Sequence, residues 1–341
     1  MTSAFVISLD FELFWGVRDS KSILGYGPNI LGVRQALPRM LDLFQQYSVR
    51  ATFATVGILF FRDKETLTRN LPNPPVKYLN PRYDWYPDYF NEQVGATEDD
   101  DPYHFGGALV EQIIRDGRHE LATHTFSHCY ALEAKQRPDS FRSDLDRGIA
   151  VARAAGARVE SIVFPRNQYD RKHLEECRAA GIRGFRGNET GWMYEPRNRA
   201  GEHPARRLAR LADSYMNLTG HHTYGWDQLR DPSGLFNVPA SRFLRPFDPR
   251  LKSLDGLRRR RITRAMSDAA KRGRIYHLWW HPHNFGTHVE ENIDFLRTVL
   301  DHYRLLNDEY SFASVTMSDC YRLAESTERV EARAPTSVAT A

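Results

Sequence analysis

The chain alternates short apolar runs with longer stretches of helical periodicity, and this alternation restricts its fold more than any other feature. The apolar runs include residues 4–9, 49–56, 119–123 and 275–280, and stretches with helical spacing of apolar residues separate them. Strand–helix–strand units join parallel strands, so the pattern predicts a parallel α/β sheet flanked by helices. About seven such units favour a barrel over an open sheet.

Polar side chains directly follow several of the predicted strands. The residues in question are Asp10 and Glu12, His124 and His128, Arg166, and His281 with His283. Parallel α/β folds place their sites at the carboxyl edge of the sheet, where all these strands end. We therefore expect these side chains to meet in one catalytic site.

The stretch from residue 117 to 128 holds two histidines that are four residues apart, His124 and His128. On one helical turn they would share a face, and two neutral imidazoles can bind one divalent metal ion. A chain with 13 histidines produces such a pair by chance fairly often, so the pair alone says little. A metal site also needs a third ligand, usually a carboxylate.

Asp10 and Glu12 can supply that carboxylate. Residues i and i+2 of a strand point the same way, so the two acids are expected to project together from the end of the first strand. Two adjacent carboxylates raise each other's pKa unless a cation lies nearby. One acid would then bind the metal and the other would act as a base; the alternative is an exposed strand end with solvated acids.

Composition narrows the class of protein. The 341 residues are enough for one large α/β domain or two smaller ones, and a net charge of +4 gives no reason to expect a nucleic-acid partner. Three cysteines without a CxxC pair indicate buried thiols in a reducing compartment. Neither a signal peptide nor an apolar run of membrane-spanning length is visible, so we expect a cytoplasmic protein.

Three segments stand apart from the alternation. Residues 62–105 are rich in proline and aromatic residues and are expected to be an insertion in the domain formed by residues 1–325. They form either a lid over a ligand or a unit with its own small core. Residues 257–272 are expected to form a basic helix, whose charges favour a solvated face over contact with a phosphate-bearing substrate or an anionic surface. Residues 326–341 are expected to be a disordered tail.

These motifs together resemble the polysaccharide deacetylase family, also known as the NodB homology or carbohydrate esterase family 4 group. The resemblance rests on residues 8–12 (Ser-Leu-Asp-Phe-Glu), 51–53, 117–128, 164–166 and 278–282. It implies a distorted (β/α) barrel that hydrolyses N- or O-acyl groups with a divalent metal, often zinc. The Asp-x-Glu spacing resembles a branch that contains cytoplasmic peptidoglycan-deacetylase-like and cofactor-independent allantoinase-like proteins.

The resemblance also implies roles for single residues. Asp10 would be the base, and Glu12, His124 and His128 would bind the metal, although which acid ligates stays open. Arg166 would pair with the base, and His281 would be the general acid, with His283 in reserve. We further expect substrate contacts from Trp15, Trp279, His283 and Asn284.

The function expected from these roles is metal-dependent removal of an N-acetyl group from a sugar, which could be a polysaccharide, a nucleotide sugar or a lipid-linked precursor. The first alternative is the same chemistry on a small amide such as a ureide or formamide. The second is a metal-containing binding protein without catalysis. A sugar would leave the aromatic residues of 62–105 lining an open groove, whereas a small ureide would need a closed pocket.

Overall fold

A computed structural model describes residues 3–133, 138–195 and 203–333 of the chain. Nine strands of this part form one curled sheet in the order β6-β5-β4-β3-β2-β1-β8-β7, and β9 pairs with β1. The strands are β1 Ala4–Phe11, β2 Thr52–Thr55, β3 Glu120–Thr123, β4 Ser161–Ile162, β5 Gly184–Phe185, β6 Phe236–Asn237, β7 Arg242–Phe243, β8 Ile275–Trp280 and β9 Ala313–Val315.

All ladders between these strands are parallel, which confirms the predicted class of a distorted parallel (β/α) barrel. The strand count is nine rather than about seven. One of the added strands is β7, whose two residues are too few for the sequence pattern to reveal.

The first strand is the centre of the sheet. All eight residues of β1 are buried, and the strand pairs with β2, β8 and β9. A strand covered on both faces reads as a continuous apolar run, which is what the sequence has at this place. Because β1 and β8 are neighbours, with Leu9 opposite Trp280, the residues that follow the two strands emerge side by side.

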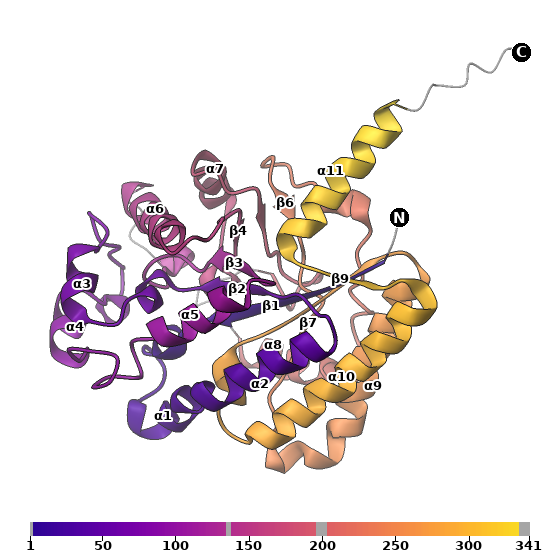
Figure 1. Cartoon of the computed structure of the whole chain (residues 1–341), viewed down its shortest axis with the longest axis horizontal. Helices are drawn as coiled ribbons and strands as arrows, with labels where there is room; N and C mark the ends of the chain where they lie inside the picture. The colour runs from indigo at the N-terminus through magenta and orange to yellow at the C-terminus, as the bar shows by residue number, and fades with distance from the viewer. Residues whose placement is uncertain (1–2, 134–137, 196–202, 334–341) are drawn as a thin grey trace, which may run out of the picture.

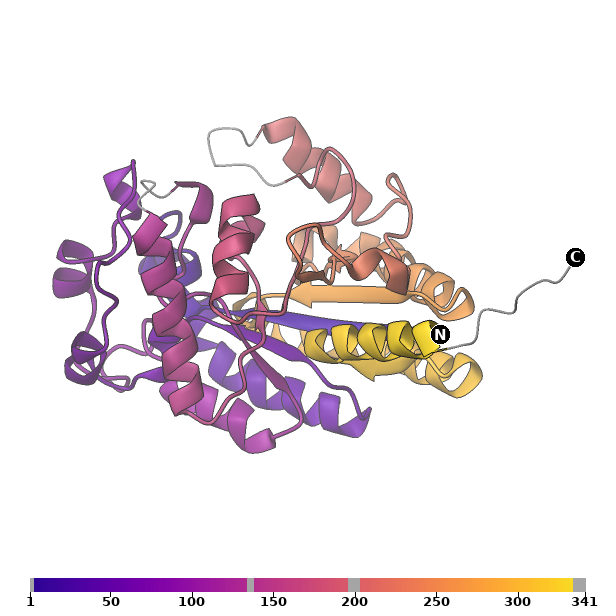
Figure 2. The same cartoon turned by 90° about the horizontal axis from the view of Figure 1, so that it is seen from above.

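Helices surround the curled sheet (Figures 1 and 2). They are α1 Ile23–Leu31, α2 Val33–Gln46, α3 Lys64–Arg69, α4 Asp88–Gln93, α5 Gly107–Asp116, α6 Pro138–Ala154, α7 Arg171–Ala179, α8 Pro204–Asp213, α9 Asp255–Lys271, α10 Val289–Tyr310 and α11 Met317–Arg333. Helices α2, α10 and α9 lie side by side along one flank. Helix α5 ends at Gly117, which takes the left-handed conformation (φ +71°) that glycine adopts without strain.

The aromatic residues of the 62–105 insertion pack inward. Tyr78, Tyr83, Trp85 and Phe90 are all buried, with Tyr78 and Tyr83 against Tyr130. The insertion therefore packs into the apolar core of the domain: Trp85 and Phe90 join the cluster around Trp15, so a separate small core is not what these residues form. A lid function for the insertion stays a prediction.

The basic helix and the C-terminal segment differ in part from expectation. Helix α9 confirms the predicted helix, but Arg258 and Arg261 are buried in it rather than solvated. Residues 326–333 continue α11 instead of starting the predicted tail, and an ion pair of 2.6 Å between Arg230 Nη2 and Glu328 Oε2 ties this part of the helix to the domain. Residues 334–341 lie outside the described residues.

Cys129, Cys177 and Cys320 are free and buried, as the sequence predicts. Among the helices of the described ranges, none combines the length and the apolar character that crossing a membrane requires.

Candidate active site

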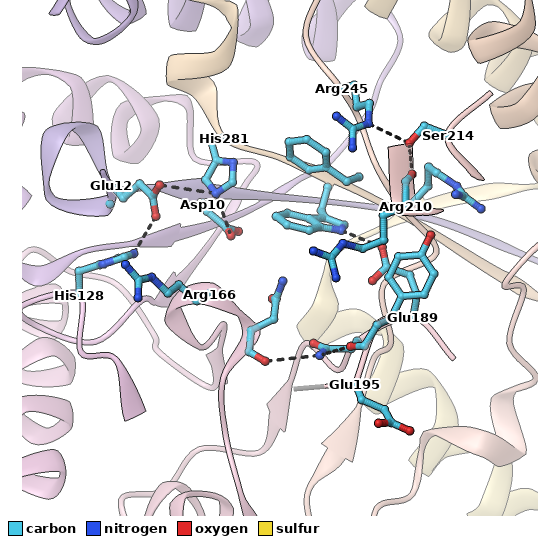
Figure 3. Close-up of a pocket in the computed structure, with 17 residues that line it drawn as sticks. Asp10, Glu12, His128, Arg166, Glu189, Glu195, Arg210, Ser214, Arg245 and His281 are labelled. Atoms are coloured by element: carbon cyan, nitrogen blue, oxygen red, sulfur yellow. Dashed lines mark hydrogen bonds and ion pairs between the residues drawn. The ribbon is translucent and has the colours of Figure 1, made fainter. Parts of the chain in front are cut away.

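Polar residues at the ends of several strands lie around one pocket, as their positions in the sequence predict. The pocket is lined by side chains at the carboxyl ends of β1, β4, β5 and β8 and by the loop after β3, and its volume is about 370 Å³. Among them are Asp10, Glu12, His128, Arg166 and His281 (Figure 3). The expectation that Asp10 and Glu12 point the same way is met.

The two histidines of the 117–128 stretch come together on a loop, so the prediction of a shared helical turn is wrong. Residues 124–130 follow β3 without helical structure, and Thr125 and His128 both have positive φ, 61° and 57°. Asp144 of α6 stabilises this strained path, because its Oδ2 accepts hydrogen bonds from the backbone N–H groups of Phe126 and Ser127 at 2.9 and 3.2 Å.

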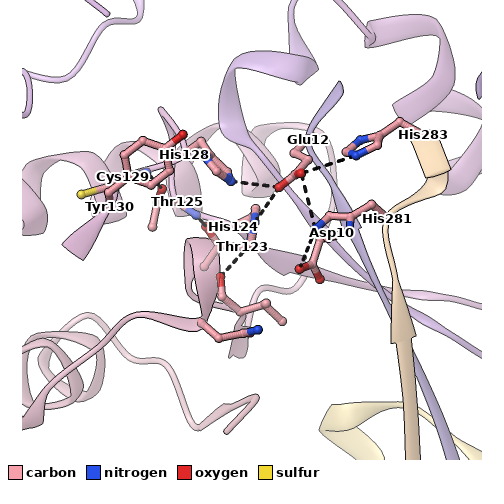
Figure 4. Close-up of polar contacts among 12 residues, drawn as sticks. Asp10, Glu12, Thr123, His124, Thr125, His128, Cys129, Tyr130, His281 and His283 are labelled. Carbon is pink, nitrogen blue, oxygen red and sulfur yellow. Dashed lines mark hydrogen bonds and ion pairs between the residues drawn. The ribbon is translucent and has the colours of Figure 1, made fainter. Parts of the chain in front are cut away.

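Glu12 lies between two pairs of histidines (Figure 4). Its Oε2 is 3.3 Å from His124 Nε2 and 2.9 Å from His128 Nε2, and all three side chains are buried. Its Oε1 is 3.5 Å from His281 Nε2 and 3.9 Å from His283 Nε2. Both trios could hold a metal ion, but the trio of Glu12, His124 and His128 is the tighter and the more deeply buried.

The donor chemistry of the tighter trio fits a metal ion. His124 Nδ1 lies 2.7 Å from the Val163 carbonyl oxygen and donates its hydrogen there, which leaves the lone pair of Nε2 facing the Glu12 carboxylate. Two bare acceptors at this distance repel each other unless a cation lies between them. Tetrahedral ligands of one zinc ion, each about 2.0–2.2 Å from it, are spaced by roughly 3.3–3.6 Å. The distances of 3.3 and 2.9 Å from Glu12 Oε2 to the two histidines are at or just below this spacing.

Two of the three deeply buried histidines near Glu12, His128 and His283, have a lowered pKa, which favours the neutral form that can bind a metal ion. Burial lowers the pKa of His128 to about 4 and that of His283 to about 3. Among the described residues, the Nδ1 atoms of both rings lack a hydrogen-bond partner.

Gly16 makes room for the Glu12 side chain. A Cβ atom at position 16 would lie 2.0 Å from Glu12 Cδ, far inside the contact distance of two carbon atoms. Glycine is therefore the residue that lets this carboxylate lie against the short helical turn Leu13–Gly16.

The cation that pairs with Asp10 is Arg186, so the predicted pairing with Arg166 is wrong. Arg186 Nη1 and Nη2 donate to Asp10 Oδ1 and Oδ2 at 2.6 and 2.8 Å, and both side chains are buried. Arg186 also donates to Ser8 Oγ at 3.0 Å and lies over the Trp279 ring. Burial is the largest single influence and raises the pKa of Asp10. The charge and hydrogen bonds of Arg186 and the nearby His124 and His281 together outweigh burial and hold the pKa below its usual value.

Arg166 points elsewhere because the backbone turns at this residue. Its φ is 57°, and its guanidinium forms an ion pair with the buried Asp19 and lies 3.7 Å from the centre of the Tyr130 ring. Arg166 thus lines the pocket but does not contact Asp10.

His281 stands beside both acids. Its Nε2 is 3.7 Å from Asp10 Oδ2 and 3.5 Å from Glu12 Oε1, and 23% of its side chain is exposed. The Asn284 side-chain amide nitrogen lies 3.3 Å from His281 Nδ1, so the amide holds the ring with Nε2 facing the acids.

Of the side chains predicted to contact the substrate, some lie at the pocket and others do not. Trp279 lines the pocket, and Asn284 touches the pocket residue His281. Trp15 is fully buried, donates its Nε1 hydrogen to the His104 carbonyl at 2.8 Å and packs against Trp85, so its predicted substrate contact is wrong. His283 is buried behind Glu12.

Sequence analysis missed Arg186 although a signal for it was present. Arg186 directly follows β5, as the other site residues follow their strands. The family resemblance points to Arg166 for the same role, and two arginines after neighbouring strands cannot be told apart by position alone.

The fold is a parallel (β/α) barrel, and its pocket brings together the types of side chain that a hydrolase would need. Residues 25–185 match the family model for polysaccharide deacetylase, which confirms the predicted family resemblance over a little less than half of the chain. The predicted enzyme class, a deacetylase among the hydrolases of non-peptide carbon–nitrogen bonds, is confirmed with it. Asp10, Glu12, Arg186 and His281 lie outside the matched range.

Solved structures of low sequence identity share the fold. A putative polysaccharide deacetylase from Mycobacterium smegmatis has a TM-score of 0.58 at 16% identity and covers 97% of this chain and 91% of its own. The alpha-amylase AmyC from Thermotoga maritima has a TM-score of 0.53 at 12% sequence identity, and the match covers 94% of this chain and 75% of AmyC. PuuE allantoinase has a TM-score of 0.51 at 11% sequence identity, and the match covers 95% of this chain and 90% of the allantoinase. No curated protein sequence matches the chain.

Proposed function

We propose that this protein is a metal-dependent hydrolase that removes an N-acetyl group from a sugar. One observation carries the proposal. A buried carboxylate and two buried histidines converge at 2.9 and 3.3 Å, next to a second carboxylate held by an arginine and a histidine that faces both acids.

Glu12, His124 and His128 would hold the metal, and we propose zinc because two imidazoles and a carboxylate are a donor set that zinc favours. A divalent ion bound there would polarise the acyl oxygen and lower the pKa of a water molecule. We propose Glu12 rather than Asp10 as the ligating acid, because Glu12 Oε2 lies 3.3 and 2.9 Å from the Nε2 atoms of the two histidines.

Asp10 is proposed as the base that accepts a proton from the attacking water. The two hydrogen bonds from Arg186 fix the carboxylate plane and favour the ionised form, which is the form that can accept a proton. Arg186 is a positioning residue in this proposal, because it acts through Asp10.

His281 is proposed as the acid that gives a proton to the leaving amine. An amine leaves poorly as an anion, so the C–N bond breaks when nitrogen receives a proton. The Nε2 of His281 faces the space beside Asp10 and Glu12. The proton given to the amine is the one that the imidazolium form of His281 carries on Nε2, and its loss leaves the ring neutral. His283 is less suited to this role, because it is buried behind Glu12.

A cavity of about 370 Å³ suits a sugar residue with its acyl group, since ligand pockets start at about 300 Å³. The pocket walls include Trp279 and Phe243, on which the apolar face of a sugar ring can pack. Aromatic residues from 62–105 do not take part in this proposed contact, because they pack inward.

The test is acetate release from a panel of N-acetyl sugars by metal-loaded protein, with and without chelator. Chelator-sensitive acetate release supports the proposal. Metal binding without acetate release from any sugar would favour the small-amide alternative, which allantoin and formamides would then test. Failure to bind metal after reconstitution would contradict the site itself.

A further inference from the structure

The end of the pocket away from Glu12 is lined by arginines. Arg210 of α8, Arg242 of β7 and Arg245 after β7 all face it, and Figure 3 shows Arg210 and Arg245 across the pocket from Glu12 and His128. The catalytic groups proposed above do not use these side chains.

Arg245 has no carboxylate partner among the residues that the structure describes. Its Nε donates to Ser214 Oγ at 2.9 Å, and this is the hydrogen bond that its guanidinium makes. Burial lowers its pKa, and the positive charges of Arg210 and Arg258 lower it further. A half-buried guanidinium with positive neighbours is an unfavourable arrangement unless an anion joins it.

Two hydrogen-bond donors of Arg242 also lack an acceptor among the described residues. Its Nη1 is paired with Asp213 Oδ2 at 2.5 Å, but its Nε and Nη2 are buried without a hydrogen-bond partner among the described residues. Only 4% of the side chain is exposed. Asp213 therefore satisfies only part of this guanidinium, whose positive charge lies on the pocket wall.

Two of the acids near this end, Asp213 and Glu189, are not partners of Arg245; Glu195 also lines the pocket. Asp213 is shared between Arg242 and Arg261, which lies behind it on α9. Glu189, on the pocket wall, is buried, and burial raises its pKa and so disfavours its charged form.

We propose that this end of the pocket binds an oxyanion, a carboxylate or a phosphate, that the substrate itself carries. The substrate class is then an anionic N-acyl sugar, held by Arg245 with Arg242 and Arg210 while its acyl group lies at Glu12 and Asp10. The guanidinium fork matches the oxygens of carboxylate and phosphate groups, which makes arginine suited to either. This inference rests on the proposed function for its sugar part, whereas anion binding can be measured without turnover.

The first experiment is equilibrium binding of three probes to metal-loaded protein by calorimetry in a low-salt buffer. The probes are N-acetylglucosamine, N-acetylglucosamine 1-phosphate and N-acetylmuramic acid, which are neutral, phosphorylated and carboxylated. We expect at least one anionic probe to bind about tenfold or more tightly than the neutral sugar, with affinity that falls as salt is added. The preferred anion tells phosphate from carboxylate.

The second experiment uses Arg245→Met, with Arg259→Met on the exposed face of α9 as the matched control for net charge. Arg245→Met should lose about tenfold or more affinity for the anionic probe and leave the neutral probe unchanged, and Arg259→Met should change neither. Arg245→Lys keeps the charge, so its affinity for the anionic probe should lie between those of the wild type and Arg245→Met. If Arg245→Met fails to fold, Arg245→Lys takes its place in the comparison. Equal binding of all three probes, or unchanged anion affinity in Arg245→Met, would overturn the inference.

Acetate release is then measured from each probe with the same proteins. Anion binding that depends on Arg245 without acetate from any probe would contradict the proposed function while sustaining the anion site. Acetate release that is indifferent to the anion and to Arg245 would contradict the anion site while sustaining the proposed function.

Discussion

The pairing of Asp10 with Arg186 leads to the most demanding prediction. Arg186→Met removes the guanidinium and leaves an apolar side chain of comparable length. Asp10 would then keep its buried position without a counterion. The two hydrogen bonds of 2.6 and 2.8 Å, between side chains that are 0% and 4% exposed, place the pair among fully buried ion pairs. Removing one partner of such a pair costs about 3–5 kcal/mol in the free energy of unfolding.

The same substitution should affect catalysis separately from stability. With Arg186 absent, the Asp10 carboxylate can rotate, and misplacement of a catalytic group by about 1 Å costs about 100-fold in rate. Arg183→Met is the control on the same segment, because Arg183 forms its ion pair with Glu325 at the half-exposed surface and should contribute less than about 1 kcal/mol. Urea unfolding and kcat on the best sugar substrate measure both effects.

A double-mutant cycle tests which arginine, Arg186 or Arg166, interacts with Asp10. Asp10→Asn with Arg186→Met should cost less than the sum of the single changes, with a coupling of about 2 kcal/mol, because the groups are in contact. Asp10→Asn with Arg166→Met should be nearly additive, because Arg166 is paired with Asp19. Coupling to Arg166 and none to Arg186 would refute the assignment.

Three further predictions follow from the site and its surroundings. Asp10→Asn should retain metal binding but lose acetate release, and near wild-type turnover would remove Asp10 from the mechanism. Gly16→Ala should displace Glu12 and weaken metal affinity about tenfold or more, measured by competition with a chelating dye; unchanged affinity would mean that Glu12 is not a ligand. Asp213→Asn should destabilise the protein by about 3 kcal/mol at neutral pH, because it breaks the buried pair with Arg242. The pKa of Asp213 is lowered in the folded protein, so this difference in unfolding free energy should shrink as the pH falls below about 4; a constant difference from pH 7 to 3 would contradict the assignment.

The class of fold was predictable because β1 and β8 are buried on both faces. Their sequences are therefore continuous apolar runs, and the polar residues after them had to meet at the carboxyl edge of the sheet. Strand β7 was not predictable, because two residues held by pairing to β8 carry no periodicity of their own. Tertiary contacts define such a strand.

The site was predictable in its residue types but not in its local geometry. His124 and His128 approach Glu12 on a strained loop, whose path depends on Asp144 from a helix later in the chain. Arg186 replaces Arg166 beside Asp10 because the backbone at Arg166 turns into the left-handed region and carries its side chain to Asp19. Neither a backbone turn of this kind nor the depth at which Trp15 is buried can be derived from spacing along the sequence.

The central claim is that Glu12, His124 and His128 bind a metal ion that hydrolysis requires. Elemental analysis of purified wild-type protein, His128→Ala and the control His302→Ala on α10 tests it most directly, with acetate release measured on the same samples. The account predicts a stoichiometric divalent metal ion, with zinc expected, in the wild type and in His302→Ala. It predicts loss of both metal and activity in His128→Ala. Full activity in metal-free protein, or metal content that His128→Ala leaves unchanged, would contradict it.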